Sequence, residues 1–488
     1  MTTVLYFASI GAFATFLLWL LFGWRHDLDA RLVAKRQIPF EVVGTWMAVA
    51  FTWGTTYLYT ASLTYSQGIV GFSVFAFGNT LGLILPYWIA GRMRTPEKKY
   101  SWPEAMGEWY GWGAGKCSAV FSMLVQVLYA LSLQFIVVTL VLTKIVGVSP
   151  DVAIASSASL MLVMMALGGI RSSFTLDILK AGMMSALILY IAPHTIDHAG
   201  GISAVIGGLS GVVGVPAAKE SMTVFLLTSG VPIIVSLVTA GAIDQALYQR
   251  YFSAKPGPRR ATVFFMVVGV SLFVLNMVAS GALGALAANP LLGVEIAKGQ
   301  EGIAGFIAIQ KFAPEVANFF ILTVVVSFFA SGDTALNAST GVFIKEIVQP
   351  MWPKASDYTL RVVQVVAAAV FIIPAAYVAH IGTSMLFMVA IVGVFRSPFL
   401  FPTLYGALAG KVRAQNVLGI IAIAMVVGVG LFTTGKYCSL PKQSCELPLM
   451  GAEGYMFVGS LAGWIITGLY FTVVWWKHRT PQGAVQRS

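Results

Sequence analysis

The sequence predicts an all-α polytopic membrane protein with about thirteen transmembrane helices. The first observation is that the apolar stretches are each long enough to cross a hydrocarbon core of ~30 Å, which takes ~20 helical residues. The second is that the intervening loops alternate between Lys/Arg-rich and Lys/Arg-poor, as membrane topology requires. The composition agrees, since 58% of the 488 residues are hydrophobic and 10% are charged. The predicted spans are 4–24, 41–66, 68–93, 116–146, 151–169, 174–197, 223–249, 259–287, 313–344, 358–380, 384–410, 415–435 and 455–476.

The loop charges predict the orientation of these spans. Most of the 30 Lys and Arg residues lie in loops that follow odd-numbered spans, beginning with a cluster from Arg25 to Arg36. The positive-inside rule therefore places the N-terminus outside and the C-terminus in the cytoplasm of a multi-pass cell-membrane protein. The net charge of +11 would suggest nucleic acid in a soluble protein. Anionic headgroups next to the cytoplasmic loops account for it here, so the lipid bilayer is the expected partner and nucleic acid is not.

The three cysteines carry little chemistry. Cys438 and Cys445 share one outer loop, YCSLPKQSC, on the oxidising side, which favours a disulfide over two free thiols. Cys117 begins a helix on the inner side and is expected only to pack. No Cys/His cluster has metal-ligand spacing, so we expect no cofactor, and no metal beyond a coupling Na⁺.

Five charged residues are expected at lipid depth: Asp177, Lys180, Asp244, Asp333 and Arg396. Charges at lipid depth are unfavourable and are expected to face a cavity or a partner. Three carboxylates against two cations leave one negative charge, which suits a transported Na⁺ or H⁺, although a carboxylate in low dielectric can also stay protonated. A local ion pair between Asp177 and Lys180 is the structural alternative, because i,i+3 residues are neighbours on a helix.

Two spans show signs of broken helices. Trp53-Gly54-Thr55-Thr56 interrupts the second span, and Gly241 precedes Asp244 and Gln245 in the seventh. These positions correspond if spans 2–6 and 7–11 are two five-helix halves. Matching interruptions in two halves indicate a substrate site near the bilayer midplane, where unwound backbone lines a cavity. The alternative is that each glycine serves close helix packing.

The ninth span concentrates oxygen-bearing side chains around Asp333. Hard oxygen ligands are those that a small cation prefers. The alternative is helix packing with the hydroxyls bonded to their own backbone. The residues are Ser331, Asp333, Thr334, Asn337, Ser339 and Thr340.

Four motifs in order resemble the sodium:solute symporter family over nearly the whole chain. They are Gly168-Gly169 with Asp177, the stretch from Asp244-Gln245 to Gln249-Arg250 with Ala254-Lys255, the run from Ser331 to Thr340, and Gly393 with Pro398. The resemblance implies a LeuT-type fold of two inverted five-helix repeats. It divides the chain into an extra helix with a cytoplasmic loop (1–40), two repeats (41–197 and 198–410), and two C-terminal helices with a tail (411–488).

The resemblance also implies a sodium site. It places carbonyl ligands near Val49, Thr52 and Ser327, two hydroxyls at positions 330 and 331, and the acidic residue at Asp177. Ala330 lacks the first hydroxyl, Ser331 has the second, and Lys180 stands where the family usually has glutamine. Either Lys180 replaces the ion and gives sodium-independent or proton-coupled transport, or Na⁺ still binds through Ser331 and the carbonyls.

The expected function is secondary active symport of a small polar solute by alternating access, coupled to Na⁺ or H⁺. Arg396 suits a carboxylate or an amino acid, because guanidinium grips carboxylate through two parallel bonds. The alternatives are that Arg396 pairs with an internal partner such as Asp333, or that its side chain extends to the inner membrane surface. We expect the protein to be neither an enzyme nor a channel. A transporter-like membrane sensor is a less favoured alternative. The expected oligomeric state is a monomer or a loose oligomer. The expected substrate contacts are Trp53, Gly54, Thr55, Asn79, Asp244, Gln245 and Arg396, with Tyr57 as an apolar wall.

Overall fold

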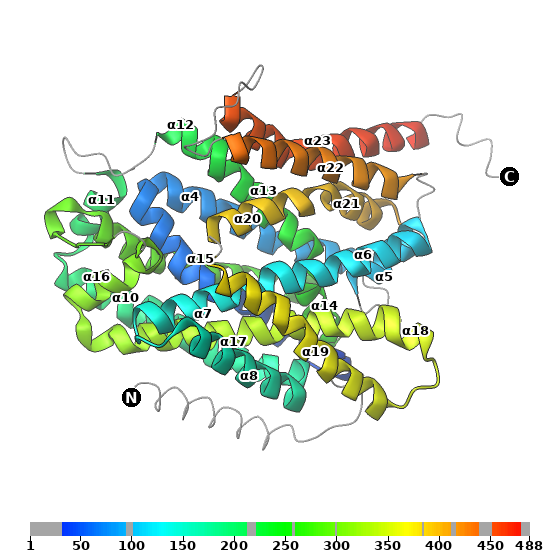
Figure 1. The fold of residues 1–488 in the computed structure, drawn as a ribbon, viewed down its shortest axis with the longest axis horizontal. Coiled ribbons are helices and arrows are strands. Elements are labelled where there is room, and N and C mark those ends of the chain that lie inside the picture. Colours follow the sequence, from blue (N-terminus) through cyan, green and yellow to red (C-terminus); the bar gives the residue numbers. More distant parts are fainter. Residues whose placement is uncertain are drawn as a thin grey trace. The chain divides into compact units, whose positions relative to one another are not determined.

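The computed structural model describes most of the chain, and its ordered elements are helices (Figure 1). The described residues are 32–93, 101–211, 221–255, 259–297, 300–382, 385–410, 416–438 and 451–479. Within them the β-structure is confined to one isolated bridge, between Ile38 and Ala254. The predicted all-α class is therefore confirmed.

Within the described part of the chain, ten helices are long and apolar enough to cross a membrane. Two shorter apolar helices, Glu41–Phe51 and Pro150–Ala166, fall within the predicted spans 41–66 and 151–169. The first predicted span, 4–24, lies outside the described residues, so the count of thirteen stays a prediction. The ten are Gly54–Met93, Trp112–Lys144, Ser173–His198, Met222–Ser253, Met266–Ala288, Pro314–Met351, Asp357–His380, Phe387–Ala409, Val417–Cys438 and Ala452–Trp476.

The chain forms two compact units, of which the first comprises Met1–Ala76, Ser122–Met222 and Gln245–Met385. Its core packs apolar side chains of several helices around Val49, Leu58, Val137 and Phe320. Its main helices are α3 (Phe40–Phe51), the start of α4 (Gly54–Met93), α7 (Ser132–Lys144), α8 (Pro150–Gly168), α9 (Ile170–Ala186), α10 (Ala192–His198), α11 (Ile202–Ser210), α14 (Gln245–Ser253), α15 (Arg259–Ala288), α16 (Ala304–Phe312), α17 (Ala317–Val342), α18 (Gln349–Met351) and α19 (Asp357–His380).

The second unit comprises Phe77–Phe121, Thr223–Asp244 and Leu386–Ser488. Side-chain hydrogen bonds tie its helices together, such as that from Trp464 Nε1 to Thr239 Oγ1 at 3.0 Å. The indole of Trp102 similarly donates to Thr403 Oγ1 at 3.0 Å. Besides the end of α4, the unit contains α5 (Trp102–Tyr110), α6 (Trp112–Val125), α12 (Met222–Phe225), α13 (Val231–Ile243), α20 (Met385–Arg396), α21 (Leu400–Ala409), α22 (Val417–Cys438) and α23 (Gly451–Arg479).

Two glycines mark boundaries that the sequence predicts between spans. Gly68 interrupts α4 with φ 56°, a backbone conformation that residues with a Cβ rarely adopt. It falls between the predicted spans 41–66 and 68–93. Gly169, with φ 59°, separates α8 from α9 between the predicted spans 151–169 and 174–197.

Four single turns of wider π-helix occur inside the apolar helices. Such turns insert one extra residue, and they are frequent at functional sites. One of them, η2, directly precedes α7 in the first unit. The turns are η2 (Gln126–Leu131), η3 (Leu187–Ile191), η4 (Leu226–Gly230) and η8 (Phe343–Val348).

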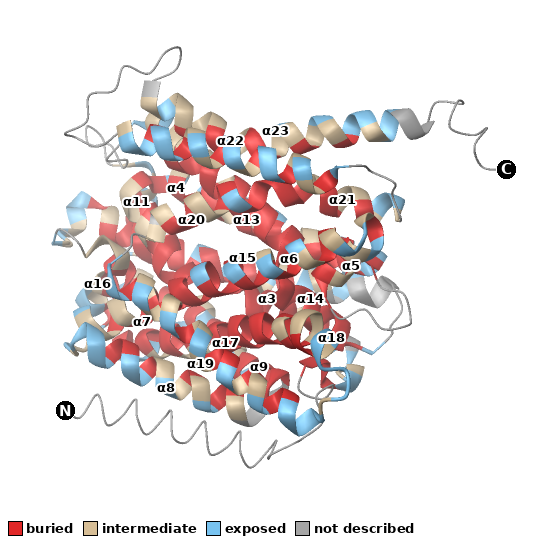
Figure 2. Ribbon diagram, turned by 45° about the vertical axis from the view of Figure 1, so that its right-hand side comes forward, coloured by how far each residue is buried: buried red, intermediate tan, exposed pale blue. Residues whose placement is uncertain are grey.

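The helices differ in how much of their surface other helices cover (Figure 2). In its most apolar window, Pro314–Met351 is 78% buried, whereas Val417–Cys438 is 28% buried. Exposed apolar residues along α19 and α22, such as Ile373 and Val426, suit a lipid-facing surface. The polar α17 is thus an inner helix of the first unit, where oxygen-bearing side chains find protein partners rather than lipid.

Candidate functional site

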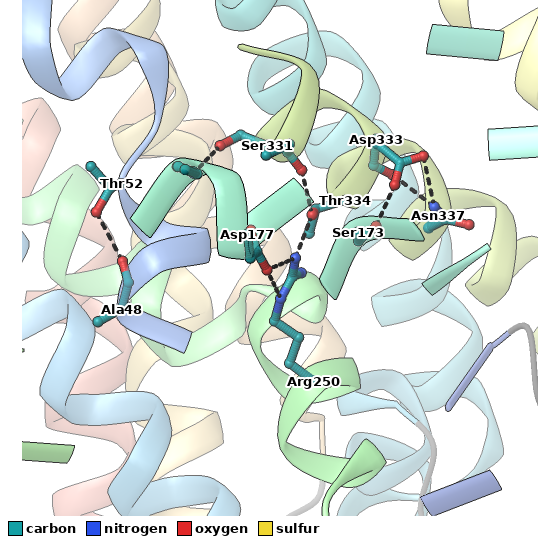
Figure 3. A network of polar contacts seen from close by, with 11 residues as sticks. Ala48, Thr52, Ser173, Asp177, Arg250, Ser331, Asp333, Thr334 and Asn337 are labelled. Atoms are coloured by element: carbon teal, nitrogen blue, oxygen red, sulfur yellow. Dashed lines mark hydrogen bonds and ion pairs between the residues drawn. The ribbon is translucent and has the colours of Figure 1, made fainter. Parts of the chain in front are cut away.

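The predicted interruption of span 41–66 is confirmed and lies between α3 and α4. Thr52 has an extended backbone, with φ −77° and ψ 90°, and α4 begins at Gly54. The Thr52 hydroxyl donates to the Ala48 carbonyl at 2.9 Å (Figure 3). The Trp53 N–H donates to Thr56 Oγ1 at 3.1 Å, so side chains satisfy part of the broken backbone.

The predicted interruption of span 223–249 is confirmed as well. Helix α13 ends at Ile243, Asp244 is extended with φ −71° and ψ 105°, and α14 begins at Gln245. Asp244 and Gln245 are both buried. Gly241 does not make the break, because it packs against α4 within the second unit, where a Cβ would lie 1.5 Å from the Gly82 carbonyl oxygen. The packing alternative is therefore the right one for this glycine.

A buried ion pair joins α9 to α14 in the first unit (Figure 3). Arg250 donates to Asp177 Oδ2 through Nε at 3.2 Å and through Nη2 at 2.7 Å. Nη2 also donates to the Thr334 hydroxyl on α17 at 2.7 Å, and that hydroxyl donates to the Ala330 carbonyl at 2.7 Å. One guanidinium therefore connects three helices, in the planar fork geometry that suits Arg.

Lys180 makes a separate contact with α17. Its Nζ donates to Ser331 Oγ at 2.8 Å, and both side chains are buried. The alternative of a local Asp177–Lys180 ion pair is wrong, because among the described residues Asp177 pairs with Arg250. The lysine instead reaches across to the hydroxyl that the family resemblance assigns to the sodium site.

Asp333, two residues after Ser331 on α17, is the centre of a third group of contacts (Figure 3). The Ser173 hydroxyl of α9 donates to Asp333 Oδ2, and Asn337 Nδ2 donates to Oδ1 at 3.1 Å. Asn337 Nδ2 also reaches the Asp333 backbone carbonyl at 3.0 Å. Donors from two helices thus hold this carboxylate, which is fully buried.

Together, these three groups of contacts between α9, α14 and α17 form a polar network, which contains equal numbers of positive and negative formal charges. The carboxylates are Asp177 and Asp333, and the cations are Lys180 and Arg250. Counting charges by predicted span misses Arg250, because this residue lies just past the end of the predicted span 223–249. The apparent excess of one negative charge is therefore not present in this part of the first unit.

Side chains at the positions that the resemblance assigns to a sodium site have protein partners here. The Ser327 hydroxyl donates to the Tyr57 hydroxyl at 3.2 Å, and Ser331 accepts from Lys180. Ala330 adds its methyl group to an apolar cluster with Met164 and Leu176. Val49 and Thr52 lie at the end of α3, where the Val49 carbonyl accepts from the Thr52 N–H at 3.1 Å.

The predicted substrate residues divide between the two units. Trp53, Gly54, Thr55 and Gln245 belong to the first unit, and Asn79, Asp244 and Arg396 to the second. Arg396, the last residue of α20, is 1% exposed.

The cysteine predictions meet different outcomes. Cys438 ends α22, but Cys445 lies outside the described residues, so the disulfide stays a prediction. Cys117 is exposed on α6, so its expected packing role is wrong.

Sequence reasoning missed two residues of the polar network as contacts, Arg250 and Ser173, and it gave no role to Gln134, a buried residue of α7 outside that network. The position of Arg250 in the sequence could have indicated its role, because Arg250 lies five residues after Gln245, on the short helix that follows the second break. Ser173 lies one turn before Asp177 on the same helix. Nothing in the sequence distinguishes Gln134 from a glutamine that packs between helices.

The profile of the sodium:solute symporter family matches residues 32–428. No curated protein matches the chain. Among solved structures, a substrate-bound outward-open Na⁺-coupled sialic acid symporter is 15% identical, covers 94% of this chain and 95% of its own, and has a TM-score of 0.71. Mhp1, a nucleobase-cation-symport-1 family transporter, is 14% identical, with 91% and 94% covered and a TM-score of 0.57.

A manganese transporter from Eremococcus coleocola is 12% identical, with 91% of this chain and 97% of its own covered and a TM-score of 0.51. At these identities the likeness shows a shared fold. The predicted LeuT-type transporter architecture is confirmed.

Proposed function

The chain belongs to the sodium:solute symporter family, and we propose that it carries a small organic anion or amino acid with the Lys180 ammonium in place of the family's sodium ion. Coupling then comes from a proton, bound and released by the lysine amine during the transport cycle. The contact that carries this proposal is the 2.8 Å hydrogen bond from Lys180 Nζ to Ser331 Oγ.

The local chemistry supports a built-in cation over a bound sodium ion. Na⁺ needs several oxygen ligands at once, as hard cations do. Here one expected hydroxyl is replaced by the methyl group of Ala330, and Ser331 already accepts from an ammonium. A second cation, Arg250, bonds the next hydroxyl along α17, that of Thr334. Because the carboxylates and cations of this network are equal in number, no excess negative charge is left to attract a mobile cation.

The two helix breaks suggest how the solute is held and moved. Unwound backbone next to α4 and α14 offers N–H and carbonyl groups away from lipid. Alternating access would change the exposure of this region from one membrane face to the other. Arg396 favours a carboxylate among the small polar solutes.

The topology follows the loop charges. We place the N-terminus outside and the C-terminus in the cytoplasm, with residues 41–197 and 198–410 as the inverted repeats.

Family membership favours a second candidate, sodium-coupled symport through Ser331 and the backbone carbonyls near Val49 and Thr52. In this candidate Lys180 would release Ser331 when Na⁺ arrives. The two candidates differ in one measurable property, namely whether sodium binds.

Thermal melting of the purified protein in detergent separates them, with NaCl exchanged for KCl at constant ionic strength. A ligand that binds only the folded state raises the melting midpoint by mass action. We expect equal midpoints in the two salts, because Lys180 already holds the site. A rise specific to sodium would refute the lysine replacement and establish the second candidate.

A further inference from the structure

Two histidines lie one turn apart at the end of α10, away from the polar network. His194 and His198 are four positions apart, so the helix places them on one face. Their ring centroids are 4.2 Å apart. His194 is partly buried and His198 is exposed, so both rings reach solvent. The proposed topology puts this end of α10 on the outer face of the membrane.

A backbone hydrogen bond determines which nitrogen of His198 is free. Its Nδ1 lies 2.9 Å from the backbone carbonyl oxygen of His194. Because a carbonyl oxygen only accepts, Nδ1 carries the hydrogen and donates it. In the neutral imidazole, Nε2 then keeps its lone pair. His198 Nε2 is therefore available as a ligand.

A carboxylate orients the ring of His194. The Nε2 atom lies 2.5 Å from Glu315 Oε1, on the short helix η7 (Pro314–Val316) that leads into α17. The ionised carboxylate accepts, so Nε2 donates, and Nδ1 keeps the lone pair of the neutral ring. The Tyr190 ring, one turn earlier, stacks on His194 with 16° between the two planes. Hydrogen bond and stacking together hold this imidazole in one orientation.

Each imidazole thus has the arrangement that is typical of a metal ligand. Metal-bound histidines donate one ring N–H to a carbonyl or a carboxylate, and they bind the ion through the other nitrogen. Two histidines at i and i+4 on one helix face bind zinc in metalloprotease helices. With metal–nitrogen bonds of ~2.1 Å, the two nitrogens must lie within ~4 Å of each other. Rings with centroids 4.2 Å apart meet this condition after small side-chain rotations, which are fast at an exposed position.

We propose that His194 Nδ1 and His198 Nε2 bind one divalent transition-metal ion, of the class of Zn²⁺, Ni²⁺ and Cu²⁺. Imidazole nitrogen suits these ions, whereas Mg²⁺ and Ca²⁺ take oxygen ligands. Among the described residues, no three Cys, His, Asp or Glu side chains form a group that could hold a metal ion. The ion therefore has two protein ligands and completes its coordination with water. Glu315 is a positioning residue, because it orients His194 without touching the ion.

Sequence spacing predicts no metal beyond Na⁺, and this site departs from that prediction. The difference comes from contacts that spacing does not show, above all the pairing of His194 with Glu315, 121 positions away. The site requires neither Lys180 nor a solute. Its test is therefore independent of the proposed transport function.

Isothermal titration calorimetry of the purified full chain in detergent, without a polyhistidine tag, tests the site. The probes are Zn²⁺ and Ni²⁺, with Mg²⁺ as the ion that should not bind. We expect Zn²⁺ and Ni²⁺ to bind and to raise the melting midpoint, because they bind the folded chain. The electron paramagnetic resonance spectrum of bound Cu²⁺ should show coupling to two imidazole nitrogens.

His198→Gln is the primary variant, because it removes one ligand and leaves the contact between His194 and Glu315 in place. Loss of one of two linked ligands should weaken Zn²⁺ binding about 100-fold. The Cu²⁺ spectrum should then show one imidazole nitrogen. Glu315→Gln should weaken binding about tenfold, as changes behind a metal ligand do, and should keep the signal of two nitrogens.

His380→Gln is the matched control. That exposed ring also meets a carboxylate, with Nδ1 3.1 Å from Asp151 Oδ1, but the sequence has no second histidine within four positions of it. The control should bind Zn²⁺ and Ni²⁺ as wild type does.

Three results would overturn the proposal: neither Zn²⁺ nor Ni²⁺ binds, His198→Gln binds them as tightly as wild type, or His380→Gln loses as much affinity as His198→Gln. The last result would place the ion away from α10.

Discussion

At the residue scale, burial changes what a charged side chain does. Arg250 and Arg361 both fall in Lys/Arg-rich segments that set orientation, yet both are buried. Arg361 Nη2 donates to the Ala166 carbonyl near the end of α8 at 3.2 Å, where helix carbonyls lack partners. Loop-charge counting therefore does not distinguish a solvated cation from one that holds helices together.

The Asp177–Arg250 pair should show strong energetic coupling. Asp177→Asn leaves a buried guanidinium without its counter-charge, so we expect a loss of about 3–5 kcal/mol in the free energy of unfolding. Arg250→Gln leaves a buried carboxylate and should cost a similar amount. Chemical denaturation in detergent measures both.

The double variant is the control for this pair. Asp177→Asn with Arg250→Gln should cost much less than the sum of the single changes, because neither charge is then left alone. Additive costs would show that the two residues do not act on each other.

At the element scale, close packing decides where the helices lie. Helix α15 approaches α4 so closely at Gly284 that a Cβ there would lie 2.1 Å from the Ala61 carbonyl oxygen. Ala61 and Gly284 both belong to the first unit, and small residues permit such close approach in membrane proteins. Backbone, unlike a flexible side chain, cannot move aside without moving its helix.

Gly284→Ala should therefore destabilise the protein, by about 1–3 kcal/mol as for other overpacked sites. The same substitution at Gly182 on α9 is the control, because a Cβ there meets nothing within 4 Å. Gly182→Ala should be neutral or slightly stabilising, since alanine is the better helix former. Melting midpoints of the two variants compare them directly, and a Gly284→Ala midpoint equal to that of Gly182→Ala would contradict the packing argument.

At the scale of the whole molecule, the choice of coupling ion depends on where several helices place their charged side chains. Lys180 from α9 and Arg250 from α14 both bond hydroxyls of α17. Each contact removes an oxygen that a mobile cation could use. The chain thus combines a sodium-symporter family match with a local charge balance that needs no sodium.

Restoring the family's residues should restore sodium dependence. Lys180→Gln with Ala330→Ser frees Ser331 and adds the missing hydroxyl, so solute uptake into proteoliposomes should gain a requirement for Na⁺ that wild type lacks. Uptake is measured with the Na⁺ and pH gradients imposed separately. Lys180→Gln alone is the control for the loss of the ammonium. Ion dependence that stays as in wild type would rule out the replacement.

The sequence by itself determined the membrane class, the succession of apolar helices, the two helix breaks and the family. These features depend on local properties: apolar length, runs of helix-poor residues, and motif spacing. It also identified Asp177, Lys180, Ser331 and Asp333 as residues at lipid depth that require partners.

Only the tertiary structure decided which partners they have. Asp177 pairs with Arg250, 73 positions away, and Lys180 bonds Ser331, 151 positions away. Pairing depends on the direction in which helices distant in the chain present their side chains. That direction follows from how the helices pack. Close contacts at glycines and breaks in helices fix the rotation of each helix about its axis, and a local sequence pattern does not specify this rotation.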